Sequence, residues 1–264
     1  MRKEEKNLSL KENFVGWCET KSRKDSLGLL IGGILAGVYI GFASQLFTLV
    51  TATPLASFGF TQLLGGLSFS VGLVMVVLGK ADLFTGNCLL FARCLEGYRH
   101  LKATLYNWLL VYLGNLGGSL LLVFLYAHSG LFKMGGGIIV ERIAAIAQAK
   151  VNLTFQEALV RGILCNWLVC LAVLFCIMAE NNLNRILAIP GPIATFVALG
   201  YEHSVANMYL LPIGMMAQKY LQTTPSITWG KIFFANLLPV TLGNIVGGSF
   251  FVGFLYFLLF DKEK

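Results

Sequence analysis

The chain of 264 residues is 56% hydrophobic and 12% charged, and its mean hydropathy is +0.73. Of its 20 basic and 13 acidic residues, twelve lie within the first 25 positions, so the rest of the chain is very poor in charge. Ordinary soluble domains carry roughly 25% charged residues, and so little polarity cannot cover a globular surface. The composition therefore excludes a soluble protein and predicts an integral membrane protein. The net charge of +7 is then a signal of topology and not of nucleic-acid binding.

The distribution of charge divides the chain into three parts. Residues 1–25 contain no apolar core of the length that a secretory signal needs, and Leu8 to Thr20 are typical of an amphipathic helix on the cytoplasmic membrane surface. Residues 26–260 form the expected transmembrane domain. Residues 261–264 form a short polar tail.

Six mostly apolar stretches approach the roughly 20 residues that a spanning helix requires. The stretches are 26–50, 62–79, 103–129, 162–179, 186–217 and 232–260. The longest polar connection, 130–161, predicts a short amphipathic helix around 139–149. Six passes would place both termini on one side of the membrane. That side would hold 13 of the lysines and arginines against six on the other, which predicts cytoplasmic termini in a plasma (inner) membrane.

A weak internal repeat suggests that the chain is built from two related halves. Residues 116–126 resemble residues 246–256, and each segment follows a Gly-Asn pair, Gly114-Asn115 and Gly243-Asn244. Three spans separate the copies, so the second copy would be inverted in the membrane. Inverted repeats with interrupted helices are a known way to build a transport pathway.

Two interruptions occupy matching places in this repeat. Residues 79–87 end the second span and residues 199–207 lie inside the fifth, and both contain glycine, ionisable groups and hydrogen-bonding side chains. Irregular backbone is tolerated at membrane depth only where it is buried in protein or lines a cavity. Two broken helices that meet near the midplane are typical of a pore. We expect Asp82 and Glu202 to brace the backbone amides of the loops rather than contact substrate.

The motifs Asp82-Leu-Phe-Thr-Gly-Asn87 and Gly200-Tyr-Glu-His-Ser-Val-Ala-Asn-Met208, together with the helix around Asn166, closely resemble the formate/nitrite transporter family. The likeness covers nearly the whole chain after residue 25. It implies an aquaporin-like fold with six transmembrane helices, of which helices two and five are broken, and a homopentamer with one pore in each protomer. It also implies conduction of small monovalent anions such as formate, nitrite, hydrosulfide and sometimes lactate.

The resemblance assigns roles to particular residues of this chain. The central histidine of the family corresponds to His203, its threonine on the first broken loop to Thr85, and its vestibule lysine to Lys150. The asparagines that brace the loops correspond to Asn166 and Asn207.

The apolar constrictions of the family correspond to five further residues: Phe69, Leu73, Leu83, Phe84 and Phe196. Where formate channels often have Thr-Ser-Thr on the first loop, this chain has Thr85-Gly86-Asn87, which looks more like the nitrite and hydrosulfide branches.

The expected chemistry follows from the cost of moving an anion through a medium of low dielectric constant. We expect Lys150 to attract the anion, and His203 and Thr85 to bind it between two apolar gates. His203 would either donate a hydrogen bond or give its proton, which would let a neutral acid pass the gate.

The sequence leaves a hydrosulfide channel of the same family as an alternative. Two rival classes of protein are less well supported. An aquaporin-like channel for neutral solutes would carry Asn-Pro-Ala on both loops, and this chain has none. A membrane enzyme would need a catalytic or metal-binding motif such as HExxH or GxSxG, which is absent, and the six cysteines form no CxxC. We therefore expect no enzymatic activity, no metal and no cofactor.

Overall fold

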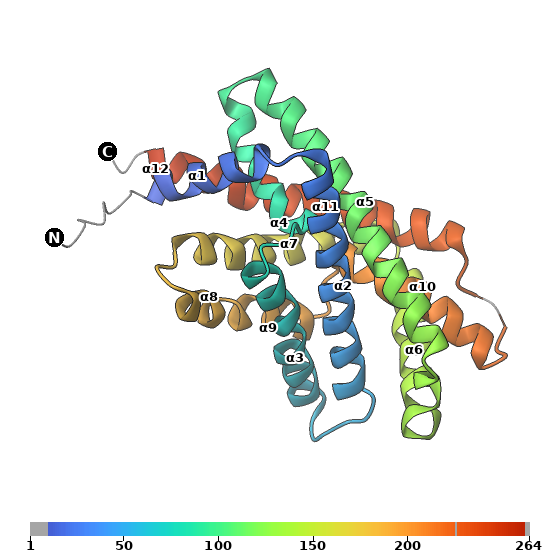
Figure 1. Ribbon diagram of the computed structural model, residues 1–264. Coiled ribbons are helices and arrows are strands. Elements are labelled where there is room, and N and C mark those ends of the chain that lie inside the picture. Colours follow the sequence, from blue (N-terminus) through green and yellow to red (C-terminus); the bar gives the residue numbers. More distant parts are fainter. Residues whose placement is uncertain (1–9, 225, 262–264) are drawn as a thin grey trace.

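The computed structural model describes residues 10–224 and 226–261, and within these ranges every regular element is helical (Figure 1). Residues 1–9, where the expected amphipathic helix begins, and residues 262–264 of the expected tail lie outside the described residues.

Five helices in the described ranges are long and apolar enough to cross a membrane. They are Ser26–Val50 (α2), Phe58–Leu78 (α3), Tyr98–His128 (α5), Phe155–Met178 (α7) and the continuous helical run Lys231–Phe260. This last run comprises η3 (Lys231–Leu237), α11 (Leu238–Gly248), η4 (Ser249–Phe254) and α12 (Leu255–Asp261), and η3 and η4 have π-helical hydrogen bonding.

Polar side chains cap the N-termini of three of these helices, at the start of the apolar sequence. The Asp25 carboxylate accepts a hydrogen bond from the backbone N–H of Gly28 at the start of α2, and the Ser57 hydroxyl accepts one from Phe60 at the start of α3. Thr154 and Glu157 form a reciprocal capping box at the start of α7. Such caps satisfy backbone N–H groups that have no partner inside the helix.

The expected fifth span, 186–217, is not one helix. It is divided into α8 (Asn182–Ala188), α9 (Pro190–Ala198) and α10 (Ser204–Tyr220), with irregular backbone between α9 and α10. The other expected interruption follows α3, where irregular backbone leads into α4 (Phe84–Asn87) and η1 (Cys88–Glu96). Gly200, with φ of +71°, ends α9 in a conformation that side chains other than glycine rarely adopt.

Several shorter helical elements of the described chain lie outside the five long helices. The N-terminal helix α1 (Leu10–Ser22) packs beside α12 through a contact of 6.3 Å between the ring centres of Phe14 and Phe260 (Figure 1). The connection after α5 forms η2 (Leu131–Gly137) and then α6 (Ile138–Val151), where the sequence predicts a short amphipathic helix.

Glycines bring two pairs of long helices into backbone contact at corresponding places. A β-carbon on Gly118 of α5 would overlap the carbonyl oxygen of Ile34 in α2, and one on Gly247 of α11 would overlap that of Ile163 in α7. Helices in membranes associate closely through such small residues. Conversely, large side chains such as Phe42, Leu109 and Phe124 stay exposed on the outer faces of α2 and α5, as expected for contact with lipid or another protomer.

These contacts differ by one position from the alignment of the predicted repeat. The sequence alignment pairs Gly117-Gly118-Ser119 with Gly247-Gly248-Ser249, but the structure gives Gly118 and Gly247 the same close contact. The two Gly-Gly-Ser runs are therefore one position out of register. The π-helical run η4, which begins at Ser249, holds an extra residue per turn, so the register changes by one position for the residues that follow these glycines.

The role of Gly118 is testable against its neighbour Gly117. We expect Gly118→Ala to destabilise the protein by about 1–3 kcal/mol, because the new methyl group overlaps the backbone of α2. Gly117→Ala is the matched control, since a β-carbon there meets no atom of the chain and alanine favours a helix by about 1 kcal/mol. Thermal unfolding of both purified variants in detergent measures the difference; equal losses of stability would contradict this account of the crossing.

Candidate functional site

The site is built around two short loops that interrupt the spans. The first loop, Gly79–Leu83, follows α3, and the second loop, Leu199–His203, follows α9. Both loops begin with the same kind of backbone hydrogen bond back to the preceding helix. The N–H of Ala81 donates to the carbonyl oxygen of Val76, and the N–H of Tyr201 donates to the carbonyl oxygen of Phe196, both at 3.0 Å. The two loops therefore leave their helices in the same way.

A buried asparagine holds the first loop to two helices. The side-chain amide of Asn115 in α5 donates to the carbonyl oxygens of Gly33 (2.8 Å) and Asp82 (2.9 Å), and its oxygen accepts from the N–H of Phe84 (2.9 Å). Asn115 is completely buried, so each of these bonds satisfies a backbone group that has no access to water.

A second asparagine holds the second loop by the same set of bonds. The amide of Asn244 in α11 donates to the carbonyl oxygens of Gly162 (2.8 Å) and Glu202 (3.0 Å), and its oxygen accepts from the N–H of Ser204 (2.9 Å). The asparagines of the two Gly-Asn pairs noted in the sequence thus do equivalent work, which the sequence alone had not assigned to them.

Each loop also carries a buried carboxylate that binds lysine. Asp82 binds the ammonium groups of Lys21 (2.7 Å) and Lys24 (2.6 Å), and Glu202 binds that of Lys150 (2.7 Å). Burial lowers the pKa of Lys21, and the neighbouring Asp82 opposes this effect. Among the described residues, the two carboxylates therefore anchor lysines from α1, from the connection between α1 and α2, and from α6, and not the loop amides expected from the sequence.

Two pairs of asparagines extend these ion pairs in parallel. The Asn207 amide donates to Glu202 Oε2 (2.6 Å) and Asn236 Oδ1 (2.7 Å), and Asn236 donates to the carbonyl oxygen of Lys150 (3.0 Å).

Around the first loop, Asn87 donates to Asn107 Oδ1 (2.9 Å), and Asn107 donates to the carbonyl oxygen of Lys21 (3.3 Å). The helices α1 and α6 thus hold corresponding positions against the two loops.

Thr85 and His203 meet between the two loops. The Thr85 hydroxyl lies 3.1 Å from His203 Nε2, and both side chains are almost fully buried. His203 Nδ1 accepts a hydrogen bond from the backbone N–H of Ala206 (3.0 Å), so this nitrogen carries no proton. The proton of the neutral imidazole is consequently on Nε2, which faces Thr85.

Two phenylalanines enclose the imidazole. The Phe196 ring stacks on His203 with ring centres 5.9 Å apart, and the Phe69 ring lies edge-on to both, at 6.5 Å from His203 and 5.9 Å from Phe196. The hydrogen-bonding face of His203 therefore lies beside an apolar barrier.

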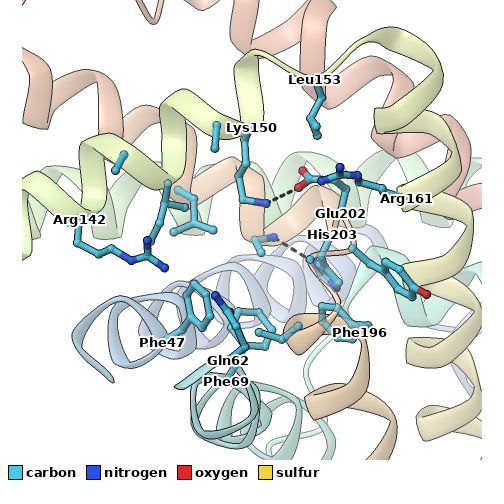
Figure 2. A pocket seen from close by; sticks show the side chains of 18 residues that line it. Phe47, Gln62, Phe69, Arg142, Lys150, Leu153, Arg161, Phe196, Glu202 and His203 are labelled. Atoms are coloured by element: carbon cyan, nitrogen blue, oxygen red, sulfur yellow. Dashed lines mark hydrogen bonds and ion pairs between the residues drawn. The ribbon is translucent and has the colours of Figure 1, made fainter. Parts of the chain in front are cut away.

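Two cavities adjoin this centre. The His203 cavity has a volume of about 250 Å³ and is lined by His203, Phe69 and Phe196 and by the cationic side chains Lys150, Arg142 and Arg161. Figure 2 shows these cationic side chains arranged around the space above His203, with the ion pair between Lys150 and Glu202 at its edge.

The second cavity, the Lys21 cavity, has a volume of about 370 Å³. Its walls come from α1, α3, α7, α8 and the first loop, and include Lys21, Leu73 and Leu83. The Lys21 cavity thus reaches Gly86, next to Thr85 in α4, whereas the His203 cavity reaches His203 itself.

Two further residues named by the sequence resemblance lie outside both cavities. Asn166 donates to the carbonyl oxygens of Thr85 (3.1 Å) and Asn244 (2.6 Å), which braces the loop. Phe84 packs against Trp108 and Tyr112 of α5 and lines neither cavity.

Several residues that contribute to the site have no role in the prediction from the sequence: Lys21, Lys24, Asn107, Asn115, Asn236, Asn244, Arg142 and Arg161. The only available signal was the repetition of the Gly-Asn pair, since the other residues reach the site from distant parts of the chain.

Comparison with known proteins gives consistent results across nearly the whole chain. Residues 9–258 match the formate/nitrite transporter family. The chain is 36% identical to a probable formate transporter of Methanothermobacter thermautotrophicus, with 93% of each protein covered. It is 35% identical to the formate channel FocA of Escherichia coli K12, over 92% of this chain and 90% of that protein, and 37% identical to an uncharacterized transporter, YrhG, of Bacillus subtilis 168.

Solved structures agree with these sequence relationships. A pentameric formate channel with formate bound has a TM-score of 0.79 and 35% identity, over 90% of this chain and 98% of that one. An ion channel of the same family has a TM-score of 0.82 and 29% identity, over 94% of this chain and 98% of that one. The protein is thus an integral membrane transport protein and not an enzyme, and the chain belongs to the formate/nitrite transporter family.

Proposed function

We propose that this protein is a channel for small monovalent anions, with formate as its main substrate and nitrite as a second, and that each chain contains one complete pore. The single observation that carries this proposal is the hydrogen-bonding pair Thr85 and His203, buried between two cavities that are rich in basic side chains. The names of the relatives support formate in particular, because two are described as formate transporters or channels.

The pore would cross the membrane through six spans arranged as an inverted repeat. Support comes from the matching hydrogen bonds of Asn115 and Asn244, and from the equal contacts of Gly118 and Gly247. The sixth crossing is then the broken pair of α9 and α10. The contact between α1 and α12 fits an even number of crossings, and the excess of basic residues favours cytoplasmic termini in the inner membrane.

The assembly is proposed to be a homopentamer in the lipid bilayer. A similar solved structure is described as a pentameric formate channel, and the exposed apolar faces of the long helices supply surface for contact between protomers.

In this proposal the positive charges of the His203 cavity collect the anion. Lys150 is largely neutralised by Glu202, so Arg142 and Arg161 supply the remaining attraction. Phe69 and Phe196 on one side, and Leu73 and Leu83 on the other, would exclude hydrated ions.

His203 would stabilise the anion as a hydrogen-bond donor. Its Nε2–H points to the position beside Thr85, and the Thr85 hydroxyl supplies a second donor. A proton-coupled version would need a second proton on Nδ1, which would remove the bond from Ala206. We therefore assign a donor role to His203, and a proton transfer to the anion becomes the alternative outcome of the experiment below.

Transport by purified protein in liposomes tests the substrate and this role together. We expect saturable formate flux, with nitrite also transported. His203→Phe, which removes the donor, should lower the flux on the order of 10- to 100-fold. His203→Asn keeps an N–H donor, so it should retain more flux than His203→Phe and leave the pH dependence unchanged.

Other outcomes of the same transport experiment would change the assignment of the mechanism or of the substrate. A pH dependence abolished by His203→Asn would replace the donor role with proton transfer. Flux of hydrosulfide without formate would identify the alternative substrate, and flux of neutral solutes alone would contradict an anion channel.

The ion pair at the second loop can be tested by a pair of substitutions. Lys150→Met leaves the buried carboxylate of Glu202 without its cation, which typically costs about 3–5 kcal/mol and puts a negative charge beside the anion path. We expect lower thermal stability and lower formate flux.

Adding Glu202→Gln to Lys150→Met should restore much of the stability, because the uncompensated charge is gone. Lys133→Gln is the matched control, since it removes an exposed positive charge from the same connection without contacting the cavity. A Lys150→Met variant as stable as the wild type would show that the pair does not hold the loop.

A further inference from the structure

The Lys21 cavity carries more positive charge than its loop carboxylate neutralises. Asp82 has one negative charge but binds two ammonium groups, those of Lys21 and Lys24. Lys80 and Arg185 also line the cavity, and none of the described residues in its lining is acidic. At the second loop, by contrast, Glu202 binds a single lysine.

Lys80 occupies a backbone conformation that favours glycine. Its φ is +53°, and the corresponding position of the second loop is Gly200, with φ of +71°. A left-handed conformation costs a residue with a side chain about 1–2 kcal/mol. Such strain is concentrated at functional sites, where the side chain contributes something that glycine cannot. The exposed ammonium group of Lys80 at the rim of the cavity is that contribution.

Arg185 has a hydrogen-bond donor without an acceptor. Its Nη1 donates to Asn182 (3.3 Å), but its Nε is buried and has no partner among the described residues. A buried N–H without an acceptor is costly, and a guanidinium presents its donors in a fork that suits the oxygens of carboxylates and phosphates. Arg185 lines the cavity, so a guanidinium whose donors are not all used forms part of its wall.

We propose that the Lys21 cavity binds a divalent tetrahedral oxyanion, either inorganic phosphate or a phosphomonoester, between Lys80, Arg185 and Lys24. The bound ion plugs the pore from this face and inhibits anion flux. Binding is independent of the proposed channel function, whereas inhibition rests on it.

The size and polarity of the cavity explain why such an ion binds but does not pass. The volume of about 370 Å³ lies within the range of about 300–1,000 Å³ for ligand pockets, so an oxyanion fits with some of its water. Beyond the cations the wall becomes apolar at Leu73 and Leu83, each 3% exposed. The cost of desolvating an ion rises with the square of its charge, so this barrier excludes a divalent ion far more strongly than a monovalent one.

Calorimetric titration of the purified protein with inorganic phosphate measures binding directly. We expect saturable binding that weakens at high salt. Arg185→Gln and Lys80→Gly should each weaken it on the order of 10- to 100-fold. Lys80→Gly should also be as stable as the wild type or more stable, because glycine relieves the strain at φ +53°.

The matched control is Arg99→Gln, which removes an exposed cation that lines neither cavity and should leave binding unchanged. Absence of phosphate binding to the wild type would overturn the proposal, as would equal binding by wild type, Lys80→Gly and Arg185→Gln.

Formate flux in liposomes, with phosphate or methyl phosphate added to each face in turn, tests inhibition. We expect inhibition from one face only, relieved in Lys80→Gly when each variant is normalised to its own uninhibited flux. Inhibition by both compounds identifies phosphomonoesters as ligands, and inhibition by phosphate alone identifies the free ion.

Transport of phosphate itself, or formate flux insensitive to bound phosphate, would overturn the plugging. If the wild type carried no formate at all, the proposed function would fail, while the calorimetric result would still decide whether the cavity binds an oxyanion.

Discussion

The structure depends on hydrogen bonds that satisfy irregular backbone where no water is available. A helix that is broken inside a membrane exposes peptide groups whose desolvation is expensive unless a partner replaces water. Asn115 and Asn244 each supply three such bonds, one to a neighbouring helix and two to the chain at the loop. An asparagine suits this task because its amide donates twice and its oxygen accepts.

These bonds also fix the geometry of the centre. Because Asn115 holds the N–H of Phe84 and Asn244 holds the N–H of Ser204, the residues beside them, Thr85 and His203, are brought to 3.1 Å from each other. The set of hydrogen bonds is the same at both loops, but the residues that it positions differ. At the position that precedes the helix, the first loop has Leu83 and the second has His203, so one side of the centre is apolar and the other carries a hydrogen-bond donor.

Part of this site could be predicted from the sequence and part could not. Ionisable groups and glycines inside apolar stretches indicate the two interruptions, because hydropathy and backbone chemistry are local properties. Lys21 and Asp82 are separated by 61 positions, and nothing local in either segment indicates that they pair. The contacts of Gly118 and Gly247 differ by one residue from the alignment of the predicted repeat, because a π-helical turn that the sequence pattern does not reveal begins at Ser249 and shifts the register of the residues after it.

Carboxylates along the proposed anion path would serve the need for the anion to leave as well as to enter. A lysine alone in a cavity of low dielectric constant would bind an anion deeply and slow its release, whereas conduction requires moderate binding. Glu202 limits the attraction of Lys150 and fixes its position at the same time. Asp82 binds two lysines, so its single negative charge neutralises only part of their positive charge. Both cavities therefore keep surplus positive charge, from Arg142 and Arg161 in the His203 cavity and from Lys80 and Arg185 in the Lys21 cavity, but only in the Lys21 cavity does the loop carboxylate also leave one of its own two lysines unbalanced, which suits the divalent ion proposed there.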